Sequence, residues 1–315
     1  MGSIPVTRCV VFAYHDVGVR CLKVLLAQGL EVALVVTHRD DPGEKIWFGN
    51  VAAVAADYDI PVETPEDPNT PEFIDRVAAL APDFLFSFYY RRMLGAALLA
   101  AATRGAYNMH GSLLPRYRGR VPVNWAVLHG ETETGATLHR MVAKPDAGEI
   151  VARQAVPILP DDTAGEVFAK VTVAAEMALA RALPGLAAGT AAHEPQDLAA
   201  GSYFGGRKPE DGRIDWRRPA TEIHNLVRAV APPYPGAFCD IAGRRLEVLR
   251  TLRQPGRPAR SGSPALYASD GRLYADCADG AVLRILEARL GDQPLDANSF
   301  AARYGDQSLP LREPA

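Results

Sequence analysis

Short apolar runs alternate with amphipathic segments from the start of the chain to about residue 150, and this alternation constrains the fold most. Between the runs, apolar residues such as Val19, Leu22 and Leu25 recur at the spacing of one helix face. Runs that are apolar throughout are typical of parallel strands covered by helices on both faces. We therefore expect an α/β fold with a mostly parallel, Rossmann-like sheet. Its predicted strands are Cys9–Ala13, Glu31–Thr37, Asp83–Phe88, Ala106–His110 and Thr134–Val142.

A change of composition separates this region from the rest of the chain. A long pattern rich in Ala and Leu predicts a helix at Thr163–Leu186, after which residues 189–206 become polar and rich in Gly and Pro. Beyond them we expect one helix at Ala220–Val230, followed by short β-rich runs separated by turn pairs such as Asp270-Gly271. The predicted parts are an α/β domain at 1–188, a linker at 189–206 and a small, mainly β, OB-like domain at 207–315.

Composition argues against several classes of function. The formal net charge is -3 and the sequence pI is near 6.2, so we expect small-molecule substrates rather than nucleic acid. The 4 cysteines show no CxxC spacing, which indicates reduced thiols and no metal site. The N-terminus lacks the pattern of a signal peptide, and no stretch approaches the roughly 20 apolar residues of a membrane span. We therefore expect a cytoplasmic protein without membrane insertion. The sequence does not indicate whether the protein is a monomer or an oligomer.

The segment Tyr107–Arg120 carries the most chemical information. Asn108 and His110 are two positions apart, so on a strand their side chains project from the same face. An amide can donate to a developing oxyanion, and an imidazole can move protons near neutral pH. Asp146, in the loop after the next predicted strand, could tune that imidazole. On spacing alone, a structural polar pair at a strand end is the more common explanation of such a motif.

The other histidines have weaker patterns. His15 and His38 directly follow the first two predicted strands and could line a cleft at the sheet edge. No partner spacing marks the rest, so we interpret them as structural residues: His129, His139, His193 and His224.

Longer motifs add a family resemblance. The segments NMHGSLLPRYRGRVPVNW and GETETGATLHRMVAKPDAGEIV resemble the core of the 10-formyltetrahydrofolate-dependent formyltransferases. That family includes enzymes that formylate methionyl-tRNA, glycinamide ribonucleotide and nucleotide-linked amino sugars. The flanking segments VVFAYHDVG, THRDDPGEK, FSFYYRRML and NLVRAVAPPYPGAF resemble the formyltransferase domains of the bifunctional polymyxin-resistance proteins. Those domains formylate UDP-4-amino-4-deoxy-L-arabinose in lipid A modification, and the resemblance covers roughly residues 8–250.

The resemblance implies roles for particular residues. Asn108, His110 and Asp146 match the catalytic Asn, His and Asp of the family, which makes 1–188 the catalytic and folate-binding domain. The co-substrate is then 10-formyltetrahydrofolate, with no metal. The implied folate-binding residues are Arg92, Met93, Leu94, Arg120, Val142, Ala143, Lys144, Pro145 and Asp146. Residues that could bind the UDP-amino sugar around the linker and the next helix are Arg207, Lys208, Asn225, Arg228 and Tyr234.

The expected mechanism needs no covalent enzyme intermediate. A neutral amine attacks the formyl carbon, Asn108 stabilises the oxyanion and His110 handles the proton that reaches the folate nitrogen. We expect Asp146 to raise the pKa of His110 above its unperturbed value of about 6.5 by favouring the imidazolium. The bifunctional proteins also carry an NAD-dependent decarboxylase, but no GxGxxG follows a strand here, so we expect no NAD.

Four alternatives remain open at this stage. One is a methionyl-tRNA formyltransferase, which the net charge of -3 disfavours. A second formylates another nucleotide-linked amino sugar, and a third hydrolyses formyltetrahydrofolate with water in place of the amine. The fourth is a non-catalytic nucleotide-binding module, which the intact Asn108, His110 and Asp146 argue against.

Overall fold

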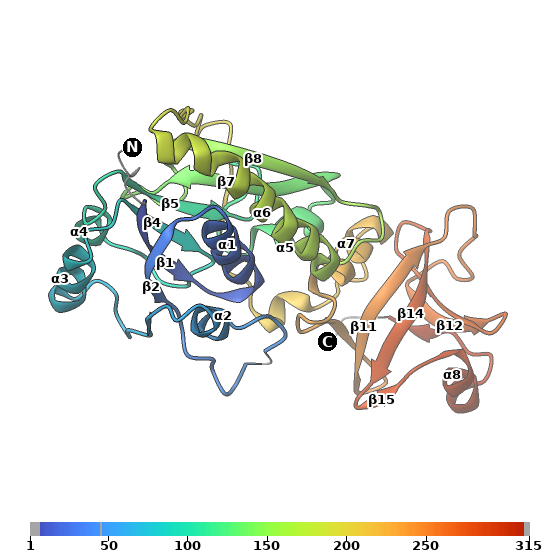
Figure 1. Cartoon of the computed structure of the whole chain (residues 1–315). Coiled ribbons are helices and arrows are strands. Elements are labelled where there is room, and N and C mark those ends of the chain that lie inside the picture. Colours follow the sequence, from blue (N-terminus) through green and yellow to red (C-terminus); the bar gives the residue numbers. More distant parts are fainter. Residues whose placement is uncertain (1–6, 45, 312–315) are drawn as a thin grey trace. The chain divides into compact units, whose positions relative to one another are not determined.

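A computed structural model describes residues 7–44 and 46–311, which form two compact units (Figure 1). Unit 1 comprises the described part of Met1–Pro122 together with Glu133–Val156 and Ala169–Gly205. Unit 2 comprises Val123–Thr132, Pro157–Phe168 and the described part of Gly206–Ala315. Two segments before residue 170 therefore pack with the C-terminal part of the chain. We had predicted one uninterrupted N-terminal domain at 1–188.

Unit 1 is built on a seven-stranded sheet with the order β3-β2-β1-β4-β5-β7-β8 (Figure 1). Strands β1, β2, β3, β4 and β5 pair in parallel, and β7 is antiparallel to β5. The mostly parallel α/β sheet expected from the sequence is thus confirmed, whereas β3 and β8 were not predicted. The strands are β1 (Arg8–Ala13), β2 (Glu31–Val36), β3 (Val62–Glu63), β4 (Phe84–Phe88), β5 (Gly105–His110), β7 (Glu133–Arg140) and β8 (Ile150–Pro157).

Helices cover both faces of this sheet. On one face, Phe73 and Val77 of α3 and Leu98 of α4 pack with Val10 and Leu85 of the strands. On the other face, α1 contacts β1 and β4, and Arg20 of α1 forms an ion pair with Glu176 of α6. The helices are α1 (His15–Ala27), α2 (Val51–Asp57), α3 (Pro71–Ala79), α4 (Ala96–Leu99), α5 (Pro122–Leu128) and α6 (Ala164–Ala188).

Local sequence signals explain where these helices begin. Thr70 precedes α3, and its hydroxyl accepts a hydrogen bond from the Phe73 amide, with Pro71 at the first helical position. Asn50 caps α2 in the same way through the amide of Ala53. Each cap satisfies a backbone donor that a helix start would otherwise leave unpaired.

Helix α6 is long and apolar enough, by length and composition, to cross a membrane. Charged residues such as Lys170 and Glu176 interrupt it, so it is not the uninterrupted apolar stretch whose absence was expected from the sequence. A single helix of this kind is weak evidence for a membrane protein, because the core helix of a soluble protein passes the same test.

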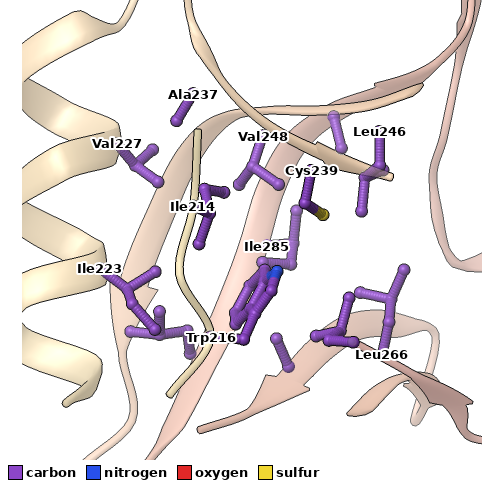
Figure 2. Close-up of a cluster of buried hydrophobic side chains, with 14 of the residues drawn as sticks. Ile214, Trp216, Ile223, Val227, Ala237, Cys239, Leu246, Val248, Leu266 and Ile285 are labelled. Carbon is purple, nitrogen blue, oxygen red and sulfur yellow. The ribbon is translucent and has the colours of Figure 1, made fainter. Parts of the chain in front are cut away.

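Unit 2 is a mainly β structure with the strand order β10-β11-β14-β13-β12-β16, and β15 pairs with β14. The neighbouring strands of this sheet pair antiparallel, and the sheet is barrel-like, as predicted for the C-terminal part. Ile223 and Val227 of α7 pack on Trp216, Leu246 and Ile285 in its core (Figure 2). The elements are α7 (Ala220–Val230), β10 (Ala237–Ile241), β11 (Arg244–Arg253), β12 (Ala265–Ser269), β13 (Arg272–Asp276), β14 (Val282–Leu290), β15 (Gln293–Pro294), α8 (Ala297–Tyr304) and β16 (Leu309–Pro310), with a short 3-10 helix at Pro209–Gly212.

Candidate active site

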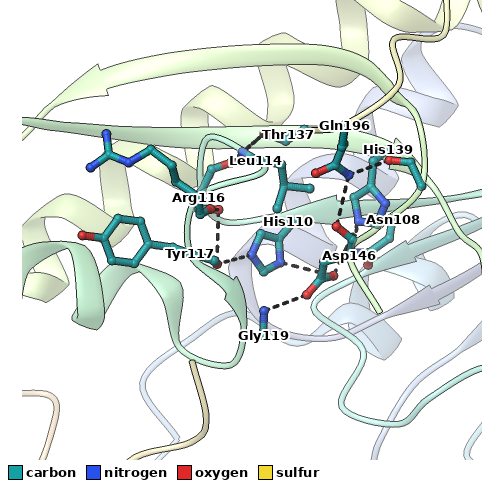
Figure 3. Close-up of polar contacts among 12 residues, drawn as sticks. Asn108, His110, Leu114, Arg116, Tyr117, Gly119, Thr137, His139, Asp146 and Gln196 are labelled. Atoms are coloured by element: carbon teal, nitrogen blue, oxygen red, sulfur yellow. Dashed lines mark hydrogen bonds and ion pairs between the residues drawn. The ribbon is translucent and has the colours of Figure 1, made fainter. Parts of the chain in front are cut away.

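The candidate site lies at the carboxyl end of β5, in the parallel part of the unit 1 sheet (Figure 3). Ligands of open α/β sheets bind at such strand ends. The His110 side chain is buried and Asn108 is partly buried. The chain then leaves the strand through Gly111, where a Cβ atom would collide with the Tyr89 hydroxyl. Glycine at this position therefore lets the loop after β4 approach the end of β5 closely.

Hydrogen bonds fold the loop after His110 back over the imidazole. The Ser112 hydroxyl donates to the Arg116 carbonyl at 2.6 Å, and the Thr137 hydroxyl donates to the Ser112 carbonyl at 2.6 Å. This turn brings the Tyr117 carbonyl to 2.8 Å from His110 Nε2. A carbonyl oxygen only accepts, so Nε2 carries a proton and donates it to Tyr117. In the neutral ring Nδ1 is then the atom that can take up a proton.

His110 Nδ1 faces Asp146, whose Oδ1 lies 3.6 Å away (Figure 3). Asp146 adopts a left-handed backbone conformation with φ 51°, and its Oδ2 accepts a hydrogen bond from the Gly119 amide at 2.8 Å. Gln196 donates to the Asp146 carbonyl at 3.1 Å and also to the carbonyl of Gly148. Contacts at its side chain and at its carbonyl therefore hold Asp146 beside the imidazole.

The electrostatics of the pair favour an ionised carboxylate beside a neutral ring. Burial alone would raise the pKa of Asp146. The positive charge that His110 carries when protonated, the approach of the His139 ring and the hydrogen bond from the Gly119 amide together outweigh burial and hold this pKa well below its usual range.

At the imidazole of His110, by contrast, burial is the dominant influence on the pKa. It lowers the pKa of His110 below its usual value by more than Asp146 and the Tyr117 carbonyl raise it. The expectation that this pKa lies above its unperturbed value was therefore wrong. The spacing of residues in the sequence does not reveal how deeply the folded chain buries the imidazole ring. The resting ring is neutral, and Asp146 stabilises the imidazolium once it forms.

His139 also belongs to this cluster, although we had interpreted it as a structural residue. It lies opposite Asn108 in the antiparallel register of β5 and β7, and its side chain is almost fully buried. Its Nε2 is 3.1 Å from Asn108 Nδ2 and 3.6 Å from Asp146 Oδ1. The strand register would have marked this residue, but the sequence does not state which residues of two strands lie opposite each other.

The implied folate-binding residues lie on three segments of unit 1: the loop after β4, the loop after β7 and, for Arg120 alone, the segment between β5 and α5. Arg92 and Met93 are exposed after β4, and Val142 and Lys144 are exposed after β7. Leu94 is buried in a hydrophobic cluster, and Met141, the residue before Val142, packs against the same cluster. The loops after β4 and β7 are therefore anchored on one hydrophobic cluster. The other members vary in exposure. Arg120 and Ala143 are exposed, while Pro145 and Asp146 are partly buried.

The residues proposed to bind a nucleotide all lie in unit 2, and two of them are already bonded to each other. Arg228 is buried, and its Nε donates to Asn225 Oδ1 at 2.9 Å. Arg207 lies over the Trp125 ring at 4.9 Å. Burial raises the pKa of Tyr234 to about 12, so its hydroxyl stays protonated. Because Asn225 and Arg228 bond to each other, fewer of their polar atoms are available to a ligand. The Lys208 side chain is exposed.

His15 and His38 follow β1 and β2 and lie in an aromatic cluster at the carboxyl ends of the strands. The His15 ring stacks on Phe48 at 3.9 Å, and the His38 ring stacks on Tyr90 at 4.2 Å. Burial, assisted by the charge of Arg91, lowers the pKa of each to about 4. Both rings are therefore neutral near neutral pH. Among the described residues, no group of three or more His, Cys, Asp or Glu side chains is placed to hold a metal ion.

Comparison with known proteins places the chain in a family. Residues 8–183 match the formyl transferase family, and residues 207–305 match the C-terminal domain of formyl transferases. The chain belongs to the formyl transferase family and is an N-formyltransferase by that membership. The resemblance drawn from the sequence is therefore confirmed at the level of the family.

Solved structures share its fold at low sequence identity. A Helicobacter canadensis N-formyltransferase, in complex with folinic acid and dTDP-3-aminofucose, is 19% identical, with a TM-score of 0.68 over 92% of this chain and 100% of its own. WlaRD, a sugar 3N-formyl transferase, is 19% identical, with a TM-score of 0.71 over 93% of this chain and 99% of its own. HypX from Aquifex aeolicus, in complex with tetrahydrofolic acid, is 18% identical, with a TM-score of 0.63 over 97% of this chain and 51% of its own.

Proposed function

We propose that this formyltransferase moves a formyl group from 10-formyltetrahydrofolate to the 4-amino group of a UDP-linked amino sugar. The first candidate is UDP-4-amino-4-deoxy-L-arabinose, which would make it a cytoplasmic enzyme of lipid A modification. The observation that carries formyl transfer at this site is the 3.6 Å approach of Asp146 to His110, beside the Asn108 amide. The choice of sugar is supported by segments such as FSFYYRRML, which resemble the polymyxin-resistance enzymes.

Asn108 and His110 divide the work of transfer in this proposal. The acceptor amine attacks the formyl carbon, and the Asn108 amide donates a hydrogen bond to the oxyanion that forms. Neutral His110 takes a proton from the attacking nitrogen at Nδ1, and Asp146 stabilises the resulting imidazolium. The tetrahedral intermediate then collapses, the bond to the folate N10 breaks, and His110 returns the proton to N10. The net proton transfer is from the acceptor nitrogen to N10.

Access to the ring sets a geometric condition for this scheme. In the structure both ring nitrogens face protein groups, the Tyr117 carbonyl at 2.8 Å and Asp146 at 3.6 Å. The Asp146 distance is too long for a hydrogen bond. The scheme therefore requires a substrate nitrogen to approach Nδ1 beside Asp146, directly or through one water molecule, while the Tyr117 contact stays in place.

The loops after β4 and β7 suit a folate. The exposed side chains of Met93 and Val142 offer apolar surface to the flat pterin ring of a folate. Arg92 and Lys144 offer positive charge to the anionic glutamate of the same molecule. Folate and folate analogues are bound by the Helicobacter canadensis, WlaRD and HypX relatives, which supports the same co-substrate here.

A panel of acceptors tests the proposal. The full chain is incubated with 10-formyltetrahydrofolate and, separately, UDP-4-amino-4-deoxy-L-arabinose, dTDP-3-aminofucose and methionyl initiator tRNA. A mass gain of one formyl group on the UDP sugar, with competitive inhibition by UDP, is the expected result. Formylation of the dTDP sugar alone would favour the second candidate, an enzyme that formylates another nucleotide-linked amino sugar. The complex of the Helicobacter canadensis relative suggests this candidate. Formylation of the tRNA alone, or formate release without an acceptor, would refute an amino-sugar substrate.

A further inference from the structure

His139 makes three polar approaches from one buried ring. Its Nδ1 lies 3.0 Å from the Arg140 carbonyl, and its Nε2 lies 3.1 Å from Asn108 Nδ2 and 3.6 Å from Asp146 Oδ1. The side chain is only 2% exposed, so water cannot replace a lost partner at little cost. A buried imidazole with this many fixed partners constrains the groups around it.

The Arg140 contact determines which ring nitrogen carries the proton. A carbonyl oxygen only accepts hydrogen bonds, so Nδ1 of His139 must be the donor. In the neutral ring Nε2 then has a lone pair and no proton. Such an atom can pair with the amide nitrogen of Asn108 but not with its carbonyl oxygen.

Asp146 favours the same orientation of the amide. Its Oδ1 lies 3.6 Å from the Nε2 atom that the Asn108 side chain contacts. In the flipped amide, Oδ1 of Asn108 would face both the Nε2 lone pair and the neighbouring carboxylate, and both contacts are repulsive. The observed orientation keeps the amide nitrogen in the cluster of His110 and Asp146. One N–H is used by His139, and the second remains available as a donor.

We propose that His139 is a positioning residue that fixes the Asn108 amide with its nitrogen toward the reacting centre. It acts through Asn108 and does not itself contact the formyl group. This inference rests on the proposed role of Asn108 as the donor to the oxyanion. Without His139, the amide can rotate, and a fraction of the molecules present the carbonyl oxygen where the donor is needed.

Replacement of the ring tests this inference through kinetics. His139→Phe keeps a buried ring and removes both nitrogens, and it should lower kcat by about 10–10²-fold, less than the 10²–10³-fold loss of a whole oxyanion donor. KM for both substrates should change by less than about twofold, because the contact matters in the transition state. His139→Gln supplies a carbonyl that can accept from the Asn108 amide, and it should recover most of the lost kcat.

Two comparisons separate positioning from general packing. His193 is a matched control, because its Nε2 pairs with the Tyr107 hydroxyl of the same strand at 3.0 Å and its Nδ1 lies 3.0 Å from the Ala191 carbonyl. His193→Phe should leave kcat unchanged. In an Asn108→Ala background, His139→Phe should cost less than about twofold further, since contacting residues that act together are non-additive. A full additive loss, or a His139→Gln variant no faster than His139→Phe, would overturn the inference.

A spectroscopic readout keeps the test independent of the acceptor. In a ¹H–¹⁵N spectrum, assigned by the loss of its signals in Asn108→Ala, the two Nδ2 protons of Asn108 should be well separated because one is bound to an imidazole. The separation should collapse in His139→Phe and persist in His139→Gln and His193→Phe. An unchanged separation in His139→Phe would refute the positioning role, whereas failure of every amino sugar in the acceptor panel would refute only the proposed function.

Discussion

Replacement of Asp146 by Asn tests the electrostatic core of the mechanism. The change keeps the size of the side chain, and the amide oxygen can still accept from the Gly119 amide, so the loop should persist. It removes a negative charge that lies 3.6 Å from His110 Nδ1. At an effective dielectric constant of about 20, a charge pair at this distance is worth about 4–5 kcal/mol before solvent and relaxation reduce it. The variant should therefore destabilise the imidazolium strongly.

The expected result is a change in both rate and pH profile. The pKa of His110 is already lowered by burial, and loss of Asp146 lowers it further, since Asp146 favours the charged ring. If neutral His110 is the base, the acid limb of the kcat profile belongs to it and must move to lower pH. At neutral pH kcat should fall by about 10²–10⁴-fold, the usual range for lost acid–base catalysis.

Steady-state rates from pH 5 to 9 and NMR titration of the ring check this prediction. If protonated His110 were the working form instead, the alkaline limb would belong to it and would retreat to lower pH. The two cases are therefore distinguished by which limb moves. An acid limb and a His110 pKa that are both unchanged in Asp146→Asn would refute the coupling and leave Asp146 with a role in ordering its loop.

Three further predictions concern the Asn108 amide, the turn at Gly111 and the partly buried histidines of unit 1. Asn108→Ala should lower kcat by about 10²–10³-fold with KM little changed, measured by steady-state kinetics, since an oxyanion donor acts in the transition state. Gly111→Ala places a Cβ against the Tyr89 hydroxyl and should lower the free energy of unfolding by about 1–3 kcal/mol in urea titrations, with the loss reduced in a Tyr89→Phe background. The stability should also fall as the pH drops below about 6.5, because rings such as His15 and His38, whose pKa values are lowered to about 4, bind protons more readily when unfolded. Urea titrations at pH 7 and 5 would show this, and equal stabilities would contradict it.

The strands and long helices could be predicted from the sequence because their patterns are local. Val10 and Phe12 belong to a run that is apolar on both faces, which favours a buried parallel strand whatever its neighbours are. β8 (Ile150–Pro157) escaped prediction because only Ile150 is buried, the residues from Arg153 onward alternate between exposed and partly buried, and the charge of Arg153 interrupts the apolar run. Its assignment depends on pairing at the edge of the sheet, which no local pattern records.

The candidate site was predictable in part for the same reason. The two-residue spacing of Asn108 and His110 gave a shared strand face, and the family motif added Asp146. His139 was missed because its contact with Asn108 depends on the register between β5 and β7. The direction of the His110 pKa was missed because the charge of Asp146 is visible in the sequence, whereas the burial that opposes it depends on the folded loop.

Single-turnover transfer of a ¹³C-labelled formyl group most directly tests the claim that this cluster performs the reaction. Wild-type protein and His110→Ala are each mixed with labelled 10-formyltetrahydrofolate and the accepted amino sugar, quenched and analysed by mass spectrometry. Folate affinity, measured by calorimetry, should be similar in the two proteins. The rate of labelled product should fall by about 10²–10⁴-fold in the variant, as expected for loss of the acid–base residue. A His110→Ala protein that transfers the label at the wild-type rate would contradict the account.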